Sequence, residues 1–508
     1  ACFRQSWEYP GRQLPVVLMP AQILNYPSPT GGWNAIDSID AMPPQCAVIL
    51  DNIFPNATSA TLRKGYSSFC ATGEAAAVQT LMEYNGGATS KLIAACNNKI
   101  IDVTSGTASV LSTGYHSDIW SHVNFATGGG TFLIAANASG SDTPIVYNGA
   151  AVAAIVAAGP GSLANLSQVM TYNQRTFYVE KNTLSVWYTA AGAFQGALTQ
   201  FDFGPFCTKG GSIAAITTWT RDNGYGGADD LFVVITTKGQ VLLYNGPNPS
   251  VATLWNLAGI FNVGEPVAGF RCVVRTGPAI LLLCADGFQP LSEYLSTGAT
   301  RAQTTDLAHK IGNAASDAVR STGTLTGWQG FVYPRGTALY VNVPQDSTTF
   351  YQYVVNTATG AWCRYKGQNA YCWALFNNAP YFGGAAGVVY LSDTGYLDGA
   401  SAITGEWQPA FQSPGQQARI INFKMARPAI RTSGDLQYTM TLDVDYNTGT
   451  FSSYSTSATV SSTTVLRNWS SVTGLGYTAS PHMWISRTED GVVELVNTIV
   501  TFELGGAI

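Results

Sequence analysis

Few side chains in this 508-residue chain have the types and spacing that chemistry requires. The chain has four histidines: His116, His122, His309 and His482. None of them lies in a metal-ligand pattern such as HExxH or a CxxC pair. His116 and His122 are close in sequence, and ordinary packing is the favoured interpretation for both. No GxSxG elbow, phosphate-binding loop or dinucleotide-binding glycine motif is present. The sequence therefore predicts no catalytic residues and assigns no cofactor.

One loop brings oxygen ligands together. The segment RDNGYGGADD contains four such side chains: Asp222, Asn223, Asp229 and Asp230. Carboxylate and amide oxygens are the ligands that calcium prefers. The EF-hand spacing is missing, so a solvated hairpin loop is favoured over a metal site.

One stretch, ARIINFKMARPAIR, places basic residues among apolar ones: Arg419, Lys424, Arg427 and Arg431. Such a row suits contact with DNA phosphates or with an acidic partner. The alternative is the solvated face of a strand. The net charge of −5 gives no reason to expect tight, sequence-independent binding of nucleic acid.

The elements that must position these residues recur seven times between about Leu81 and Leu397. Each unit has two strands joined by a tight turn. The seven hairpins are Lys91–Val103, Thr131–Gly149, Arg175–Tyr188, Leu231–Gly246, Ala279–Leu295, Thr337–Val355 and Tyr381–Gly395. A further β-rich stretch precedes each: Leu81–Tyr84, His122–Ala126, Gln168–Tyr172, Ala214–Arg221, Gly269–Arg275, Gly327–Tyr333 and Ala370–Phe376.

The spacing of these units is typical of β-propeller blades, which repeat every 40–50 residues or so, because successive hairpins start 40 to 58 residues apart. A single antiparallel sheet of this size cannot bury both faces, whereas sheets stacked around an axis can. We therefore predict an all-β fold with a six- or seven-bladed β-propeller. The alternative is a β-sandwich or a string of small β-domains.

The composition divides the chain into three parts. Residues 1–75 are rich in proline, which interrupts helices and central strands, and indicate an extended arm that docks on something else. Residues 76–400 form the propeller, interrupted by one expected helix at Thr304–Val319 that Thr305 or Asp306 caps. Residues 401–508 carry longer alternating strands and indicate a separate antiparallel β-domain, or platform, with or without strands from the N-terminal part.

Charged residues make up only 11% of the chain, against about 25% in an ordinary soluble domain. A surface so poor in charge suits a protein that packs against partners. No apolar run approaches the roughly 20 residues that span a bilayer, and the N-terminus lacks a signal-peptide core. The nine scattered cysteines are expected to be small buried side chains in a reducing compartment. These features predict a protein made in a cytoplasm and not exported.

The segment Pro27–Phe69 resembles the N-terminal signature of the tail nozzle proteins of short-tailed bacteriophages, also called tail tubular protein B or packaged-DNA stabilisation protein. The residues that carry the resemblance are Gly31, Gly32, Trp33, Asn34, Asp51, Asn52, Phe54, Arg63, Lys64, Gly65 and Tyr66. Further similar segments are Val263–Ser292, Thr404–Phe411 and the closing VTFELGGAI. Together they cover most of the chain in order.

The resemblance implies a non-enzymatic structural protein of the virion. It implies a homohexameric ring at the distal end of a short tail, which retains packaged DNA and conducts it during ejection. The implied partners are further copies of the chain, the tail adaptor ring below the portal, tail fibres or spikes, and double-stranded DNA passing without sequence recognition. The implied location is the virion tail, after synthesis in the bacterial host cytoplasm.

A function of a different class stays open. Propellers commonly host glycan-binding or glycan-cleaving sites on their loops, and a fold does not fix a function. A glycan-cleaving enzyme would need a pair of carboxyl groups about 5–9.5 Å apart, and no spacing in the sequence nominates such a pair.

Overall fold

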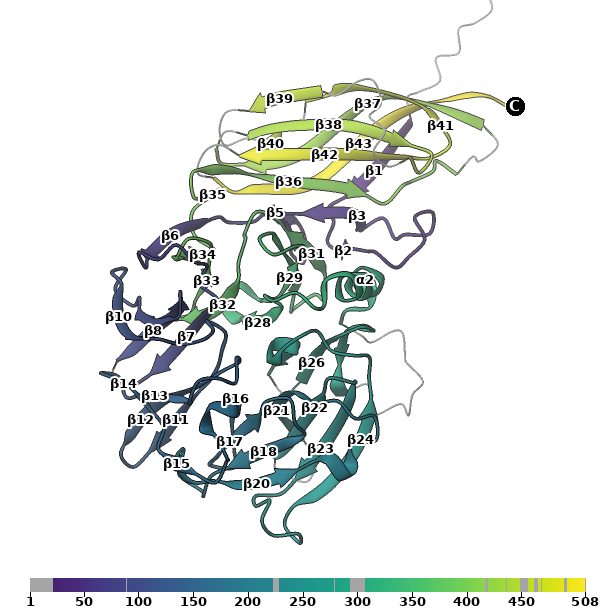
Figure 1. Ribbon diagram of the computed structural model, residues 1–508. Coiled ribbons are helices and arrows are strands. Elements are labelled where there is room, and N and C mark those ends of the chain that lie inside the picture. The colour runs from purple at the N-terminus through teal and green to yellow at the C-terminus, as the bar shows by residue number, and fades with distance from the viewer. Residues whose placement is uncertain are drawn as a thin grey trace, which may run out of the picture.

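The computed structural model describes residues 22–507 apart from 88, 223–227, 278, 293–306, 416–418, 435, 448–455, 461–464, 467 and 488–490. Two β-structures stand one on the other: a ring of small sheets, and above it an elongated β-sandwich (Figure 1). Strands of the N-terminal part, drawn in purple, lie between them. The predicted all-β class with a propeller and an additional antiparallel domain is confirmed.

Seven blades make the ring. Their first strands are β7 (Thr80–Asn85), β11 (Trp120–Thr127), β16 (Leu166–Tyr172), β21 (Ile213–Asp222), β25 (Val273–Thr276), β28 (Gln329–Tyr333) and β32 (Cys372–Phe376). Consecutive first strands contact one another around the axis, with the short turn η3 (Phe270–Cys272) and β26 taking the place of β25 beside β21. Because β32 contacts β7, the ring is closed.

The outer strands of each blade follow in sequence order. They are β8 (Ser90–Cys96), β9 (Lys99–Asp102) and β10 (Ser109–Thr113); β12 (Gly130–Asn137), β13 (Ile145–Tyr147) and β14 (Val152–Ala154); β17 (Arg175–Glu180), β18 (Ser185–Tyr188) and β20 (Thr199–Asp202); β22 (Ala228–Thr236), β23 (Gln240–Asn245) and β24 (Asn256–Asn262); β26 (Ala279–Cys284) and β27 (Gly287–Pro290); β29 (Ala338–Pro344), β30 (Phe350–Asn356) and β31 (Trp362–Tyr365); β33 (Ala379–Gly383) and β34 (Val388–Ser392). A short parallel pair, β15 (Ala157–Ala158) with β19 (Gly196–Ala197), joins the second and third blades. All seven hairpins expected from the sequence are present as the second and third strands of the blades.

Tight turns join these strands because residues of positive φ stand at the turn positions. Asn97 and Asn98 have φ of 52° and 60° between β8 and β9, and Gly239 has φ of 71° between β22 and β23. Asparagine and glycine adopt this left-handed backbone at the lowest cost. Local chemistry therefore sets the register of each hairpin.

Apolar side chains between neighbouring blades form the propeller core. Between the third and fourth blades, the rings of Phe177 and Phe232 lie 4.7 Å apart, and Trp255 lies 5.6 Å from Phe232. Phe177 and Phe232 are completely buried. Each blade thus buries one face against the next, which is why a single blade would not be stable alone.

The last blade is completed from the other end of the propeller. Its fourth strand is β6 (Tyr66–Ala71), which pairs antiparallel with β34. Phe69 of β6 packs edge-on against Tyr381 at 4.9 Å, and Cys70 is only 2% exposed. Hydrogen bonds between segments more than 300 residues apart therefore close the ring.

The sandwich has two sheets. In one, β43 (Val493–Ala507) pairs with β37 (Arg419–Thr432), β1 (Gln22–Pro27) and β5 (Ala60–Leu62), while β41 (Ser470–Gly476) and β40 (Val465–Leu466) flank β37 and β4 (Ile53–Pro55) flanks β5. The other runs in the order β3 (Cys46–Asp51), β36 (Ser401–Pro409), β42 (Ala479–Arg487), β38 (Leu436–Val444) and β39 (Thr456–Val460), with β2 (Gly32–Trp33) beside β3 and β35 (Leu397–Asp398) beside β36. Ile421, Phe423 and Met483 are among the buried side chains between the sheets.

The N-terminal part, expected to be an extended docking arm over residues 1–75, contributes strands to both structures from Gln22 onward. Strands β1 to β5 lie in the sandwich sheets and β6 lies in the propeller. Prolines such as Pro27 and Pro55 stand at the ends of short strands, where a missing amide hydrogen bond costs least. Strands of the N-terminal part thus complete the platform.

The helix predicted at Thr304–Val319 begins later than expected. The helix α2 spans Gly312–Thr322, preceded by a 3-10 turn, η4 (His309–Ile311). Ile311 has φ of −112° and ψ of 13°, outside the helical region, so the helix cannot extend through it. The proposed caps, Thr305 and Asp306, lie outside the described residues. Ala315 and Val319 face the fifth blade, as the spacing indicated.

Among the described residues, no helix is long and apolar enough to cross a membrane. Eight cysteines are described; all are buried, and none of them forms a disulfide with another. Their expected role as small apolar core side chains is confirmed for these positions.

We expect Cys70→Asp to lower the free energy of unfolding by about 3 kcal/mol or more, because the new carboxylate would be buried without a partner where β6 closes the ring. Ser68→Asp is the control, since Ser68 lies on the same strand and is exposed. Urea unfolding of both variants measures the difference. Equal stability of the two would contradict closure through β6.

Candidate functional site at the junction of propeller and sandwich

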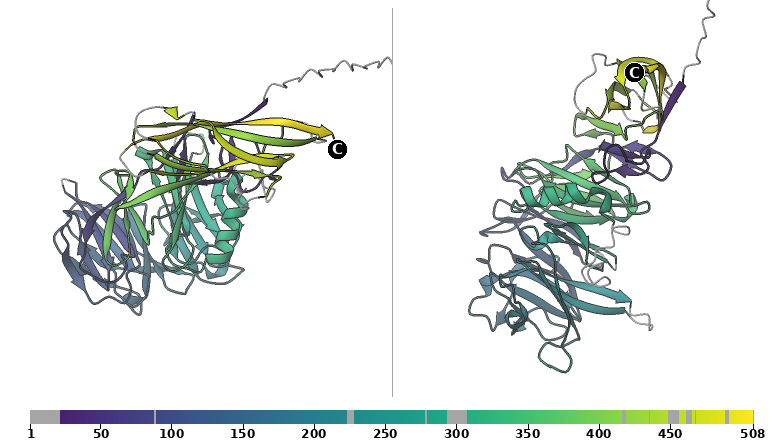
Figure 2. Two further views of the ribbon diagram at one scale, coloured as in Figure 1. Left: turned by 90° about the horizontal axis from the view of Figure 1, so that it is seen from above. Right: turned by 90° about the vertical axis from the view of Figure 1, so that its right-hand side faces the viewer.

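The residues that carry the family resemblance gather where the sandwich meets the sixth blade. Strand β2 pairs in parallel with β3, β3 pairs with β36 of the sandwich, and Asp51 at the end of β3 meets Arg364 of β31. The propeller sheet therefore continues into the sandwich through N-terminal strands, and the right-hand view of Figure 2 shows purple strands between the two structures. The shared motif thus lies at an internal junction.

Asp51 is the buried anion of this junction. Its side chain is 3% exposed and accepts two hydrogen bonds from Arg364, from Nε at 2.7 Å and from a terminal nitrogen at 2.8 Å. Lys366 also pairs with Asp51. Burial alone would lower the pKa of Arg364, but the bonds to Asp51 outweigh it and raise that pKa. The guanidinium also lies 5.3 Å over the ring of Trp33.

Arg63 forms a second buried pair. It donates two hydrogen bonds to Asp398, at 2.8 and 2.6 Å, and its Nε donates to Asn52 at 2.8 Å. Its remaining donors reach the backbone oxygens of Lys64 and Lys366. Every nitrogen of this 3%-exposed residue is therefore occupied, which a buried guanidinium requires.

Asn52 links the two pairs. Its carbonyl oxygen accepts from Arg63 and from the backbone N–H of Lys366, and its amide donates to the backbone oxygen of Thr404 in β36. It adopts φ of 57°, which asparagine tolerates better than most residues. One side chain thus contacts three segments: the N-terminal part, the end of the sixth blade and the sandwich.

Two motif glycines allow close backbone approach. Gly32 has φ of +77°, and a Cβ there would lie 2.6 Å from the backbone of Trp362. A Cβ on Gly65 would lie 1.8 Å from the carbonyl oxygen of Leu397. Side chains at these positions would push the strands apart.

The other motif residues surround the same junction. Asn34 accepts from the backbone of Asp37 and donates to its carboxylate at 2.8 Å, which shapes the turn after β2. Trp33 packs edge-on against Tyr353 at 5.1 Å, and Tyr66 against Phe382 at 5.1 Å. Gly31 lies beside the backbone of Gln45. The roles seen here are structural.

His482 of β42 lies between two carboxylates of the sandwich. Its Nε2 is 3.0 Å from Glu406, its Nδ1 is 3.3 Å from Asp443, and Gln408 donates to Asp443 at 2.7 Å. Burial alone would lower the pKa of His482, but the bonds to Asp443 and Glu406 outweigh it and raise the pKa above its usual value. The hydrogen bond from His482 in turn holds the pKa of Glu406 low. No sequence pattern marked this histidine, because its partners are distant in sequence.

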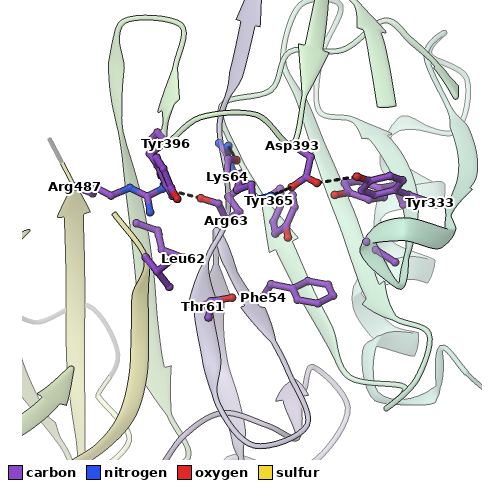
Figure 3. Close-up of a pocket in the computed structure, with 14 residues that line it drawn as sticks. Phe54, Thr61, Leu62, Arg63, Lys64, Tyr333, Tyr365, Asp393, Tyr396 and Arg487 are labelled. Carbon is purple, nitrogen blue, oxygen red and sulfur yellow. Dashed lines mark hydrogen bonds and ion pairs between the residues drawn. The ribbon is translucent and has the colours of Figure 1, made fainter. Parts of the chain in front are cut away.

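A cavity of about 190 Å³ opens beside Arg63. Figure 3 shows Tyr333 and Asp393 reaching it from the propeller side and Arg487 from the sandwich side, with Arg63 between them. The hydroxyl of Tyr333 donates to Asp393 at 2.8 Å. Arg487 lies 4.5 Å over the ring of Tyr396 and donates to the backbone oxygen of Arg63. Lys64 and Phe54, from the motif, also line this cavity.

The basic stretch lies on β37, on the outer face of the first sandwich sheet. Lys424 pairs with Glu503 at 3.3 Å and Arg431 with Glu494 at 2.8 Å. The guanidinium of Arg427 lies 4.9 Å over the exposed ring of Trp469. Arg419 is exposed at the start of the strand. The stretch thus forms a strand on which Arg419 and Arg431 are exposed, and two of its four charges are paired.

Exposed apolar side chains share this outer face. Ile23 and Met425 both stand opposite Thr501 of β43, and Leu475 stands opposite Asn422 of β37. Their exposed fractions are 59%, 40% and 69%, respectively. Side chains opposite one another across a ladder lie on the same face of a sheet. We call the face carrying Ile23, Met425, Arg427, Trp469 and Leu475 the outer face.

The fold does not bring His116 and His122 together into a shared site. His116 contacts Asp142 at 2.8 Å, whereas His122 lies on the first strand β11 with its side chain exposed. Arg271 donates across the ring to Gln79 and Thr80 of the first blade.

Of the calcium candidates, Asp222 and Asp229 lie on the paired strands β21 and β22, and Asp230 accepts from Thr220 at 2.6 Å. Asn223 lies outside the described residues. The part of the chain that the structure describes contains no group of three or more histidine, cysteine, aspartate or glutamate side chains placed to hold a metal.

No model of a protein family matches the chain, and no curated protein matches its sequence. Among solved structures, the chain is similar to Saccharomyces cerevisiae Sqt1, with a TM-score of 0.37 and 12% identity over 65% of this chain and 99% of that one. It is similar to BBS1N in complex with ARL6DN, with a TM-score of 0.41 and 12% identity over 65% of this chain and 98% of that one. It is also similar to YCF48 bound to D1 peptide, with a TM-score of 0.36 and 10% identity over 65% of this chain and 97% of that one.

We expect Asp51→Asn to lower the free energy of unfolding by about 3 kcal/mol, because it leaves Arg364 and Lys366 without their buried anion. Glu265→Gln is the matched control: it breaks an ion pair with Lys238 in which both side chains are more than half exposed, so we expect less than about 1 kcal/mol. Denaturant unfolding compares the two. A smaller effect at Asp51 than at Glu265 would rule out a stabilising role for the junction pair.

His482 makes stability depend on pH. Its pKa is raised in the folded protein above the unfolded value of about 6.5, so its stabilising contribution is complete below that pH and is lost as pH rises through the folded pKa. We therefore expect the stability difference between wild type and His482→Gln to shrink from about pH 6 upward. Thermal unfolding of both proteins across this range measures it, and a difference that grows with pH would refute the assignment.

Proposed function

We propose that this protein is a structural component of a phage tail, in which six copies form a ring that serves as the distal nozzle. The observation that carries the proposal is the outer face, where apolar side chains interleave with cations and anions on one sheet of the sandwich. The ordered resemblance to tail nozzle proteins supplies the sixfold number and the place in the tail.

The outer face has the chemistry of a subunit contact. Contiguous exposed apolar side chains rimmed by polar ones mark interaction surfaces, and here Leu475 and Ile23 are more than half exposed. Arginine and tryptophan are enriched in such surfaces, and Arg427 lies over the ring of Trp469 on this face. Repeated head-to-tail contacts of one kind close into a ring when the rotation completes a circle.

The charge pattern suits a conduit that lets DNA slide. Six copies of −5 give about −30 formal charges, facing a duplex with one negative charge per roughly 1.7 Å. A wall rich in lysine and arginine would bind phosphates and slow ejection. We therefore place the row Arg419–Arg431 at a subunit or adaptor contact, and polar and acidic loops at the lumen. The ion pairs of Lys424 and Arg431 support this, since they occupy charges that phosphates would need.

We further propose that the protein acts without catalysis, by holding and guiding DNA. The glycan-binding or glycan-cleaving alternative would require turnover or binding of a host polysaccharide that a single carboxylate substitution abolishes. We expect assays of the purified protein to show neither, and activity that one carboxylate substitution abolishes would contradict the proposal.

We expect the purified protein to form hexamers, and we expect the double substitution Met425→Asp and Leu475→Asp to leave monomers, because like charges would replace apolar contacts. Val156→Asp is the control, since Val156 is 76% exposed on the propeller, away from the outer face. Light scattering after gel filtration gives the mass, and negative-stain micrographs show rings or single particles.

Two results would contradict the proposal. One is a wild-type chain that stays monomeric within the virion. The other is an assembled tail whose lumen is ringed by the side chains of Arg419–Arg431.

A further inference from the structure

The junction cavity continues into a groove on the molecular surface. The cavity of about 190 Å³ and an adjoining depression of about 340 Å³ share Lys64, Tyr333 and Asp393 in their walls. Beyond these shared residues, the depression is lined by Arg335 and by residues of the last blade. The cavity and the depression thus adjoin at these three residues and form one site at the junction.

Two buried tyrosines line the cavity. Tyr340 and Tyr365 are 6% and 5% exposed, and their rings meet edge-on at 5.8 Å. Neither hydroxyl forms a hydrogen bond with another described residue, and both remain accessible from the cavity. Figure 3 shows Tyr365 between Arg63 and Tyr333, facing this space. A hydroxyl so placed calls for a partner in the cavity.

These hydroxyls are donors. Burial raises the pKa of Tyr340 and of Tyr365 well above the usual value, so both stay protonated. Tyr333 differs, because its hydroxyl already donates to Asp393. The two hydroxyl donors in the cavity therefore suit an acceptor group.

The walls are positive. Four cations line the cavity and the groove, namely Arg63, Lys64, Arg335 and Arg487, against one anion, Asp393. Asp398 does not line the site but forms an ion pair with Arg63. When it is counted as well, the cations still outnumber the anions. Lys64 is 54% exposed and lies 3.9 Å from Asp393, too far for a strong pair, so it remains available to a ligand.

We propose that the junction groove binds an acidic segment of a partner protein, with one carboxylate inserted between Tyr340 and Tyr365 and further acidic residues along Lys64 and Arg335. Two hydroxyl donors match the two oxygens of a carboxylate. A phosphate would call for an open guanidinium fork, and the fork of Arg63 is already filled by Asp398 and backbone oxygens. We therefore take an acidic peptide as the partner, and preference for a phosphate-bearing ligand is an outcome of the test.

The binding of fluorescein-labelled hexaglutamate to the full chain, followed by fluorescence anisotropy, tests this proposal. We expect hexaglutamate to bind at least about 10-fold more tightly than hexaglutamine. Tyr340→Phe and Tyr365→Phe remove one hydroxyl each without changing the ring, and each is expected to weaken hexaglutamate binding about 10-fold. Lys64→Ala is expected to weaken binding further and to flatten its dependence on salt.

Tyr390→Phe is the matched control, since Tyr390 lies outside the walls of both the cavity and the groove, and it is expected to bind as wild type does. Circular dichroism and melting temperatures establish that the variants are folded.

Four results would overturn the proposal: no binding of hexaglutamate, equal binding of hexaglutamine, unchanged binding by both tyrosine variants, or preferential binding of the oligonucleotide hexathymidylate. The assay reads peptide binding and not chain mass, so its failure is distinguishable from failure of the ring proposal.

Discussion

The buried carboxylate of Asp51 is the constraint on which the relation of propeller and sandwich depends. It ends a strand of the sandwich; of its two cationic partners, Arg364 lies in the last strand of the sixth blade and Lys366 follows that strand. A buried carboxylate is strongly unfavourable without partners. Any movement that separates the propeller from the sandwich must therefore expose the Asp51 carboxylate to solvent or leave it buried without its cationic partners.

Arg63, Asn52 and Asp398 extend the same constraint to the end of the propeller. Arg63 follows β5 of the sandwich sheet and precedes β6 of the last blade, while Asp398 follows that blade in sequence. The pair thus fastens the chain where it enters the ring and where it leaves it. Closing so long a loop is entropically costly, and the paired strands β6 and β34 together with this ion pair offset that cost.

The junction orients the two surfaces on which the proposals rest. The outer face of the sandwich presents apolar and basic side chains in one plane, which suits a contact between copies. The junction groove presents tyrosine hydroxyls and cations, which suits an acidic partner. Because the junction is held by buried ion pairs, the two surfaces keep a fixed direction with respect to each other. A ring built through one of them would carry the other at a regular position around its edge.

Local features of the sequence were enough to predict much of the fold. The seven hairpins followed from alternating apolar residues and from asparagine and glycine at turns, because both depend on neighbours within a few residues. The basic row on a strand followed for the same reason. The position of α2 was less well predicted, since apolar spacing continued through Ile311 while its backbone did not.

Only the tertiary structure decided what the motif residues do. Nothing near Asp51 in the sequence indicates Arg364, nothing near Arg63 indicates Asp398, and nothing near His482 indicates Glu406, because each pair is joined by strand pairing across distant segments. The same holds for β6 as the last strand of the ring and for the two tyrosines that meet in the junction cavity. Periodicity along the chain determines which segments become strands. Which strands lie side by side depends on burying their faces against distant segments, and no local pattern records that choice.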